Sequence, residues 1–332
     1  MHSLAIVGGG SWGTALAIVL SPSFERIRLW VYESDLAERM RSGRENHLYL
    51  PGFQIPANVE VHSDLGEALA RADVVLSVMP SHLVRGVYEQ MLPHLDDSMI
   101  FVSATKGLEN GTLLRSSQVI EEVLAPRFQP RVAVISGPTF AREVARGDPT
   151  ALVVASANPS VAEKIQAAFS GPTFRLYSSA DPVGVEVGGA VKNVVAIGAG
   201  VCYGLGLGSN AMAALITRGL AEMTRLAAAM GGRPLTLAGL AGLGDLVLTC
   251  TGELSRNRTV GLELARGRKL EEIIQSMRMV AEGVKTTTAT VDLARRFRVE
   301  MPISFQMYEM LHSELDPREA LRRLMERSLK SE

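Results

Sequence analysis

The hydrophobic pattern of the first half of the chain alternates between short apolar runs and amphipathic stretches. The apolar run at residues 4–7 predicts a buried strand, and the periodic residues 11–20 after it predict a helix. Strands are also expected at 27–32, 59–61, 73–78, 99–103, 131–135, 151–156 and 174–177, with helices between most of them. Strands that alternate with helices in this way predict a mostly parallel sheet covered on both faces. Residues 42–58, which contain Pro51, Gly52 and Pro56, predict an irregular loop.

The pattern changes to a helical period after about residue 180. Residues 184–207 are apolar almost all round, which predicts a buried helix. Further helices are expected at 213–230, 235–248, 263–277, 286–297 and 301–315, and a charged helix at 317–332. The sequence therefore predicts an α/β protein in two domains. Residues 1–180 are expected to form a Rossmann-like, doubly wound, mostly parallel sheet, and residues 181–332 an all-helical domain.

A glycine cluster joins the first expected strand to the first helix. Gly8, Gly10 and Gly13 have the G-x-G-x-x-G spacing in the strand–turn–helix context that gives this motif its meaning. Gly8 permits the tight turn, Gly10 lets a pyrophosphate approach the backbone, and Gly13 lets the helix pack closely on the strand. The free amides at the start of the helix favour a phosphate. The motif predicts binding of a dinucleotide; the alternative is a glycine-rich turn that binds nothing.

Glu33 stands at the end of the second expected strand, twenty residues after Gly13. An acidic residue at that place can accept hydrogen bonds from the adenosine ribose of NAD, whereas NADP favours an arginine there. Arg28, Arg39 and Arg41 are close in the sequence, so the preference between the two cofactors stays open, with a lean towards NAD or dual use. The alternative for Glu33 is a solvated charge at a strand end.

Several residues are candidates for chemistry. Lys106 follows an expected strand, at the edge where such sheets bind ligands, and Gly137 opens a second strand-to-helix corner. Lys192 lies within the long apolar helix, where an unpaired ammonium is costly and loss of solvent lowers the lysine pKa towards values useful for proton transfer. Asp245, in another apolar run, is the candidate partner for Lys192. The alternatives are that Lys106 is an ordinary surface lysine, that Lys192 reaches solvent and that Asp245 caps a helix.

Composition narrows the class of protein. A chain of 332 residues with a net charge of −1 has no bulk attraction to nucleic acid or anionic membranes. Cys202 and Cys250 form no disulfide framework, which favours a reducing cytoplasm, and the six histidines form no metal-ligand pattern. The longest uncharged apolar stretch follows Lys192, is interrupted by glycines and is short for a membrane span. The glycine-rich helical domain is compatible with a homodimer or with internal packing, and the oligomeric state stays open.

Eight motifs in order, covering nearly the whole chain, carry a resemblance to a known family. They are residues 8–15, 104–108, 136–141, 191–194, 242–246 with Thr249, 255–258, 280–283 and 301–303. Together they resemble the NAD(P)-dependent glycerol-3-phosphate dehydrogenases of the bacterial type. The resemblance implies hydride transfer between a nicotinamide and dihydroxyacetone phosphate, which gives sn-glycerol 3-phosphate and feeds glycerophospholipid synthesis.

The resemblance also implies roles for individual residues. Lys192 would be the general acid/base. The substrate would lie against Lys106, Gly137, Thr139, Lys192, Asp245, Ser255, Arg256 and Asn257. The cofactor would be held by the glycine turn and Glu33 together with Ser11, Trp12, Lys106, Ala141, Arg256, Val280 and Glu282.

The chain departs from the family at Tyr32 and Glu33, where members that favour NADPH often carry basic residues. Preference for NADPH is therefore in doubt, although nicotinamide use is not. Two other functions are weighed against the main interpretation. One is a related dehydrogenase of the 3-hydroxyacid or 6-phosphogluconate type, and the other is a non-catalytic regulator that binds a nucleotide.

Overall fold

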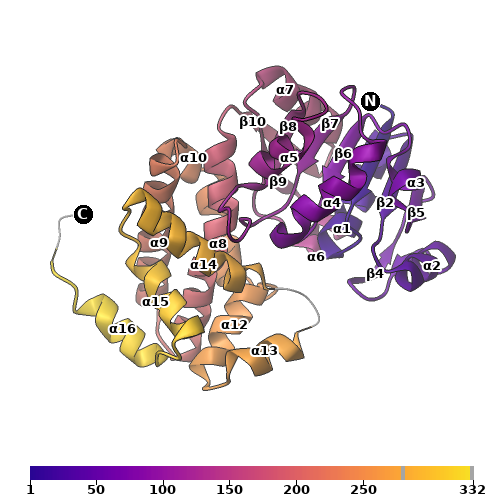
Figure 1. The fold of residues 1–332 in the computed structure, drawn as a ribbon. Coiled ribbons are helices and arrows are strands. Elements are labelled where there is room, and N and C mark those ends of the chain that lie inside the picture. The colour runs from indigo at the N-terminus through magenta and orange to yellow at the C-terminus, as the bar shows by residue number, and fades with distance from the viewer. Residues whose placement is uncertain (278–280, 330–332) are drawn as a thin grey trace.

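An eight-stranded sheet forms the N-terminal half of the computed structural model, which describes residues 1–277 and 281–329 (Figure 1). Apolar runs that are buried on both faces make its central strands, as expected for a covered sheet. The strands are β1 (Ser3–Val7), β2 (Arg26–Trp30), β5 (Val59–His62), β6 (Val74–Ser77), β7 (Ile100–Ser103), β8 (Arg131–Ser136), β9 (Thr150–Ala155) and β10 (Phe174–Ser179).

The strand order is β10-β9-β8-β7-β6-β1-β2-β5. The strands from β8 to β5 are parallel, while β9 pairs antiparallel with β8 and parallel with β10, so the prediction of a mostly parallel sheet is confirmed. From β1 the chain first runs outwards through β2 to β5 and then returns to β6 on the other side of β1. This reversal opens a crevice at the carboxyl ends of β1 and β6, where doubly wound sheets bind their ligands.

Helices cover both faces of the sheet. Leu4 and Ile6 of β1 pack into one core, and the alternating Ala5 and Val7 pack into the other. The first core is closed by α1 (Ser11–Leu20), α2 (Ser34–Gly43), α6 (Ala141–Arg146) and α7 (Pro159–Phe169). The second core is closed by α3 (Leu65–Leu69), α4 (Val84–Met91) and α5 (Ser116–Leu124). Short 3-10 turns lie at η1 (Ser21–Ser23), η2 (Ser81–Leu83) and η3 (Leu92–His94).

The prediction of an irregular loop at residues 42–58 was wrong. The segment contains a small antiparallel pair, β3 (Glu45–Asn46) and β4 (Leu50–Gln54). Leu50 is fully buried in the core beneath α1, which anchors the hairpin to the sheet layer. Pro51 and Gly52 suggested a loop. They lie in a two-stranded hairpin that is separate from the eight-stranded sheet, so the missing amide of Pro51 breaks no hydrogen bond of that sheet.

The C-terminal half is a helical bundle around α8 (Pro182–Gly204) (Figure 1). Within the described residues, α8 is long and apolar enough to cross a membrane, but its most apolar stretch lies entirely inside the protein. The carboxylate of Asp181 caps α8 by accepting from the Gly184 amide at 2.8 Å. The other helices are α9 (Ser209–Ala229), α10 (Pro234–Leu237), α11 (Asp245–Thr251), α12 (Arg256–Ala265), α13 (Leu270–Ser276), α14 (Glu282–Phe297), α15 (Pro302–His312) and α16 (Pro317–Met325).

Two predicted helices of this half are broken. Residues 235–248 form α10, a π-helical turn η4 (Leu240–Gly244) and α11, because the backbone at Gly239 is extended. Residues 263–277 do not form one helix either, since α12 has already started at Arg256 and Gly267, with φ of 84°, separates it from α13. The apolar period continues across the first break, so it gave no sign of that break.

Glu186, near the start of α8, links the helical half to the sheet layer. Its buried carboxylate accepts from the Ser117 amide at 2.8 Å and the Ser117 hydroxyl at 2.6 Å. The guanidinium of Arg115 pairs with the same carboxylate. Because Arg115 and Ser117 flank the start of α5, this cluster fixes α8 against the sheet half and so sets where the side chains in the middle of α8 lie.

Candidate active site

The glycine turn between β1 and α1 has the shape that a dinucleotide needs. A Cβ on Gly8, where φ is 127°, would lie 2.1 Å from the Val78 carbonyl oxygen, and one on Gly13 would lie 1.8 Å from the Gly8 carbonyl oxygen. Space is open at Gly10. No side chain of the described residues caps α1 and no acidic residue lies in its first turn, so its first amides can bind an anion. These features fit a pyrophosphate at the helix N-terminus.

The other residues predicted to hold the cofactor lie around this turn. Ser11 and Trp12 are the first residues of α1, and Trp12 also packs on the core beneath it. Ala141 begins α6, which packs beside α1. Glu33 follows β2 and is the N-cap residue of α2. Helix α2 lies well away from α8 (Figure 1).

Glu282 brings the helical half to the crevice. It opens α14, and its carboxylate accepts from the Ser81 hydroxyl at 3.2 Å, just beyond the carboxyl end of β6. Burial raises the pKa of Glu282, while the Ser81 hydrogen bond and the charge of Arg256 lower it. Val280, which was predicted to contact the cofactor, lies outside the described residues.

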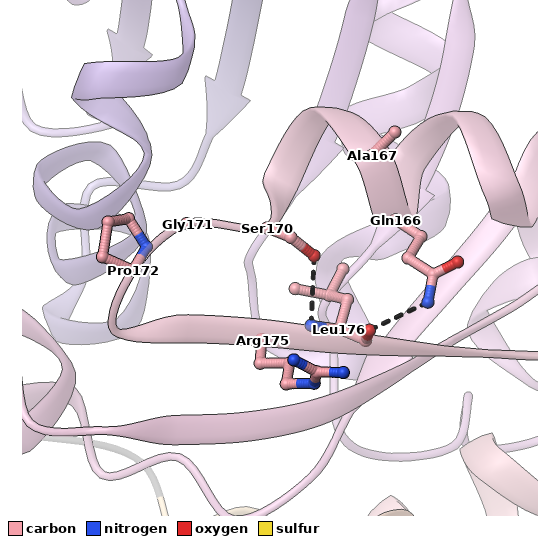
Figure 2. A pocket seen from close by; sticks show the side chains of 7 residues that line it. All are labelled: Gln166, Ala167, Ser170, Gly171, Pro172, Arg175 and Leu176. Carbon is pink, nitrogen blue, oxygen red and sulfur yellow. Dashed lines mark hydrogen bonds between the residues drawn. The ribbon is translucent and has the colours of Figure 1, made fainter.

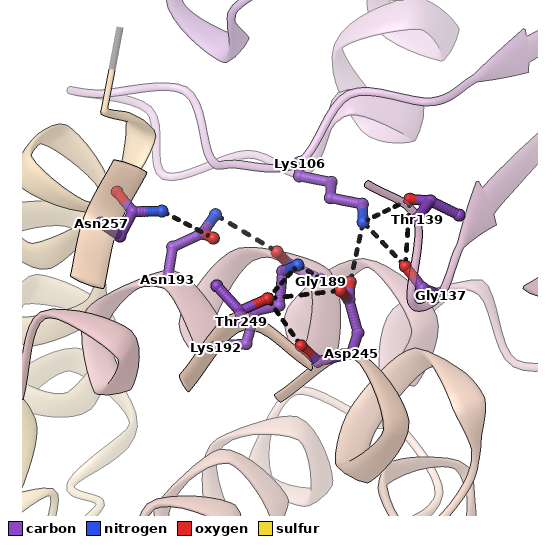
Figure 3. Close-up of polar contacts among 9 residues, drawn as sticks. All are labelled: Lys106, Gly137, Thr139, Gly189, Lys192, Asn193, Asp245, Thr249 and Asn257. Carbon is purple, nitrogen blue, oxygen red and sulfur yellow. Dashed lines mark hydrogen bonds and ion pairs between the residues drawn. The ribbon is translucent and has the colours of Figure 1, made fainter. Parts of the chain in front are cut away.

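Lys106 joins three groups from different elements (Figure 3). Its Nζ lies 2.9 Å from the Gly137 carbonyl oxygen, 3.1 Å from Thr139 Oγ1 and 2.8 Å from Asp245 Oδ2. A Cβ on Gly137 would come within 2.8 Å of Leu152, so only glycine fits at this corner. Lys106 is therefore not an ordinary surface lysine, because it connects the loop after β7 and the turn after β8 to the helical half.

Lys192 is buried in the middle of α8 and forms an ion pair with Asp245 (Figure 3). Its Nζ also donates to Thr249 Oγ1 at 2.9 Å. The predicted pairing of Lys192 with Asp245 is confirmed. Burial lowers the pKa of the Lys192 ammonium to about 7; the Asp245 carboxylate opposes this shift and the positive charge of Lys106 adds to it. An amine with such a pKa can both give and take a proton near neutral pH.

The break before α11 places Asp245. The π-helical turn η4 ends at Gly244, so Asp245 is the first residue of α11 and its side chain is completely buried. Local π-helical turns often occur at functional sites because they re-aim a side chain. Thr249 lies one helical turn further on the same face, so the i, i+4 spacing was a signal for this partner in the sequence.

The predicted phosphate site lies at the start of α12. Ser255 is the N-cap residue, and its hydroxyl accepts from the Arg258 amide at 3.3 Å. Asn257 is buried and donates to Asn193 Oδ1 at 2.9 Å (Figure 3). It also accepts from the Gly283 amide at 2.9 Å. Arg256 lies in the first turn of α12 and is accessible to solvent. Asn193, which sequence reasoning did not place in the site, thus ties α12 to α8 next to Lys192.

A surface cavity of about 400 Å³ lies elsewhere, between α7 and the edge strand β10 (Figure 2). Gln166 and Ser170 line it, but both hydrogen bond to the backbone of Leu176. Arg175, another lining residue, stacks over the ring of Tyr177. None of the predicted site residues lines this cavity, and its lining offers no acid–base pair for a reaction.

Comparisons with known proteins match the chain along its whole length. Residues 3–162 match the family model for the N-terminus of NAD-dependent glycerol-3-phosphate dehydrogenase, and residues 181–322 match the model for its C-terminus. An NAD(P)+ glycerol-3-phosphate dehydrogenase from Koribacter versatilis is 58% identical over 98% of each chain. One from Syntrophotalea carbinolica is 56% identical over 99% of each chain.

Solved structures agree with the sequence comparisons. The crystal structure of glycerol-3-phosphate dehydrogenase from Coxiella burnetii is 44% identical, with a TM-score of 0.94 over 98% of this chain and 99% of that one. The enzyme from Saccharomyces cerevisiae is 26% identical, with a TM-score of 0.83 over 98% of this chain and 99% of that one. A ketopantoate reductase from Ralstonia eutropha, 17% identical with a TM-score of 0.61, shares the fold.

Proposed function

The chain belongs to the family of NAD-dependent glycerol-3-phosphate dehydrogenases, and we propose that it interconverts dihydroxyacetone phosphate and sn-glycerol 3-phosphate. It is an oxidoreductase that uses NAD or NADP. The observation that carries the proposal is the carboxylate of Asp245, which Lys192 and Lys106 share at the meeting point of the sheet crevice and the helical half. No observation favours a hydroxyacid dehydrogenase or a silent regulator.

The residues of the glycine turn fit the cofactor. Gly8, Gly10 and Gly13, with Ser11 and Trp12, would hold the pyrophosphate against the free amides of α1. Ala141, Lys106, Arg256 and Glu282 would line the remainder of the cofactor site, with Glu33 at the adenosine ribose. When bound in reduced form, the nicotinamide supplies a hydride to the carbonyl carbon of the substrate.

Lys192 Nζ would move the proton. As an ammonium it donates a hydrogen bond to the carbonyl oxygen of dihydroxyacetone phosphate, which draws electron density from the carbon, and then gives that oxygen its proton. In the reverse direction the neutral amine takes the proton from the hydroxyl of sn-glycerol 3-phosphate. Asp245 and Thr249 hold the Nζ in place. Lys106 donates to the other oxygen of Asp245 and is itself held by Gly137 and Thr139. These three residues would line the substrate.

The start of α12 would bind the phosphate of the substrate. Arg256 offers a planar guanidinium that matches phosphate oxygens, and Ser255 and Asn257 flank it. Binding the phosphate away from the reacting carbon supplies energy that orients the carbonyl towards Lys192. The division near residue 180 would thus separate a cofactor domain, 1–180, from a substrate and catalytic domain, 181–332.

The test is the loss of reduced-nicotinamide absorbance in the presence of dihydroxyacetone phosphate, with NADH and NADPH run in parallel. We expect turnover with at least one cofactor and the phosphate-free analogue dihydroxyacetone to be a poor substrate. A panel of 3-hydroxyacids and 6-phosphogluconate serves as the comparison. Turnover of a panel member without turnover of the triose phosphate would overturn the proposal.

We also propose a cellular location, a metabolic role and an oligomeric state for the enzyme. Two free cysteines, Cys202 and Cys250, suit a cytoplasmic enzyme, and its product suits glycerophospholipid synthesis. We propose a homodimer on the basis of exposed apolar side chains in the helical half, among them Tyr203 and Leu235. Sedimentation of the 35.7 kDa chain would distinguish a dimer from a monomer.

A further inference from the structure

The hydroxyl of Tyr49 holds the carboxylate of Glu33. Tyr49 lies between β3 and β4, and its hydroxyl donates to Glu33 Oε1 at 2.9 Å. Glu33 has an extended backbone directly before α2, with its side chain partly buried. Glu33 Oε2 accepts from no other described residue, so one carboxylate oxygen is fixed and the other can accept a hydrogen bond from a ligand.

The hairpin that carries Tyr49 is attached to the glycine turn. Asn46 is fully buried, and its Nδ2 donates to the Gly9 carbonyl oxygen at 2.9 Å and to Thr14 Oγ1 at 2.8 Å. Its Oδ1 accepts from the Tyr49 amide at 3.0 Å. A single buried side chain therefore sets the position of Tyr49 relative to the turn that would hold the pyrophosphate. Two separate hydrogen-bond links join residues 46–49 to the cofactor crevice.

The charges around Glu33 disfavour a phosphate group on the adenosine ribose. A phosphate monoester, such as the 2′-phosphate of NADP, carries about −1.5 to −2 charges near pH 7, and Glu33 would repel it. The arginines close to Glu33 in the sequence already have protein partners. Arg28 donates to the Ala70 carbonyl at 2.6 Å, Arg39 to Asp35 at 2.8 Å, Arg41 to Glu38 at 2.6 Å and Arg44 to the Ile55 carbonyl at 3.1 Å.

Arg142, from the first turn of α6, also lies near the hairpin. Its guanidinium stacks over the ring of Phe53 in β4, 5.6 Å from the centroid. A 2′-phosphate would have to share one of these arginines with its present contact and lie beside the Glu33 carboxylate, whereas a ribose 2′-hydroxyl needs only an acceptor. The oxygen Oε2 of Glu33 supplies that acceptor.

We propose that Tyr49 is a positioning residue for Glu33, and that the pair selects NADH over NADPH by accepting the ribose 2′-hydroxyl and repelling a 2′-phosphate. The inference rests on the proposed function in that the cofactor must lie along the glycine turn. Tyr49 acts through Glu33, because its hydroxyl proton is already donated to that carboxylate. Tyr49 therefore has no proton left for a phosphate oxygen in this arrangement.

The test measures the dissociation constants of NADH and NADPH by the fluorescence of the bound cofactor, and kcat/KM for both with dihydroxyacetone phosphate. Wild type should favour NADH by about tenfold or more, as a hydrogen bond to a charged group allows. Tyr49→Phe should reduce that ratio about 3–10-fold through KM, with kcat little changed. Glu33→Gln should reduce it at least as much.

A double-variant comparison separates positioning from general structural damage. In the Glu33→Gln background, Tyr49→Phe should change the NADH-to-NADPH ratio by less than about twofold, because the partner charge is gone. Tyr177→Phe is the matched control, since Tyr177 is 46% exposed on β10, at the other end of the strand order from β2, and should leave the ratio unchanged. Thermal melting of every variant shows that it folds.

Three results would overturn the inference: equal or tighter binding of NADPH by wild type, equal losses for both cofactors in Tyr49→Phe, or a full Tyr49→Phe effect in the Glu33→Gln background. The binding arm separates this inference from the proposed reaction. If the expected ratio of dissociation constants is found without turnover of dihydroxyacetone phosphate, the selectivity stands and the proposed reaction fails.

Discussion

Lys192 and Asp245 form an ion pair that is almost completely enclosed by protein, although they lie on different helices and 53 residues apart. Removing a single partner from such a pair leaves an uncompensated buried charge, which is far more costly than losing a surface pair. Lys106 donates to the second oxygen of the same carboxylate, so two cations depend on one anion. This dependence makes the pair the most sensitive part of the site.

Lys192→Ala should remove the proposed proton donor without disturbing the glycine turn. A positioned general acid/base contributes about 10²–10⁴-fold, so turnover should fall at least about a hundredfold. The dissociation constant for the cofactor should stay within a few-fold of wild type. Lys164→Ala, an exposed lysine on α7, is the control and should keep full activity. Near-normal turnover of Lys192→Ala would remove Lys192 from the proposed role.

The pH dependence should report the same amine. Burial lowers the pKa of Lys192 to about 7, and reduction of dihydroxyacetone phosphate needs the protonated form. The reduction rate should therefore fall as the pH rises through about 7, while oxidation of sn-glycerol 3-phosphate, which needs the neutral amine, should rise over the same range. The inflection is read from kcat/KM between pH 5 and 9.

Asp245→Asn tests whether the Asp245 carboxylate raises the pKa of Lys192. The Asp245 carboxylate raises the pKa of Lys192 against the effect of burial, so its neutralisation should lower that pKa. The inflection for reduction should move to lower pH, and the maximal rate should fall as well. Asp97→Asn, an exposed aspartate before β7, should leave the profile in place. An unmoved inflection in Asp245→Asn would show that another group titrates.

Arg256→Ala should act mainly on substrate binding. A hydrogen bond between charged groups contributes about 1.5–3 kcal/mol, so KM for dihydroxyacetone phosphate should rise about 10–100-fold. Because the phosphate is remote from the carbon that reacts, kcat should change less. Arg266→Ala, at the other end of α12, is the control because its ion pair with Glu263 is exposed. An unchanged KM would contradict a phosphate site at Arg256.

The sequence allowed the pairing of Lys192 and Asp245 to be predicted because a buried ammonium in an apolar helix requires a partner. It did not indicate that Lys106 would share the carboxylate. That contact depends on how α8 is held against the sheet by Glu186, Arg115 and Ser117, which no local period encodes. Tyr49 was missed for a similar reason, because its contact with Glu33 depends on how Asn46 holds the hairpin at the glycine turn.

The predicted and observed elements differ where backbone geometry, and not the apolar period, decides the outcome. Strands and helices of the sheet half follow the pattern because each apolar run is buried by a layer of helices. The extended backbone at Gly239 breaks a helix within a continuous apolar run, and the β3–β4 hairpin forms across Pro51 and Gly52. Both deviations place site residues: Asp245 in the first case and Tyr49 in the second.

The close packing of α8 against α12 should be intolerant of a single methyl group. A Cβ on Gly261 would lie 1.8 Å from the Ile197 carbonyl oxygen, and one on Gly200 would lie 1.9 Å from the Arg258 carbonyl oxygen. These two glycines are thus used for internal packing. Gly261→Ala must push the two backbones apart, which should lower the free energy of unfolding by about 1–3 kcal/mol or more.

The matched control for Gly261→Ala is Gly86→Ala. Gly86 lies within α4 and a Cβ there meets nothing within 4 Å. Alanine should therefore leave stability unchanged or raise it by about 0.5–1 kcal/mol, since glycine is unfavourable inside a helix. Urea unfolding midpoints measure both variants. Gly261→Ala should also raise KM for dihydroxyacetone phosphate, because moving α12 away from α8 displaces Arg256 from Lys192; wild-type stability together with wild-type KM would refute the close contact.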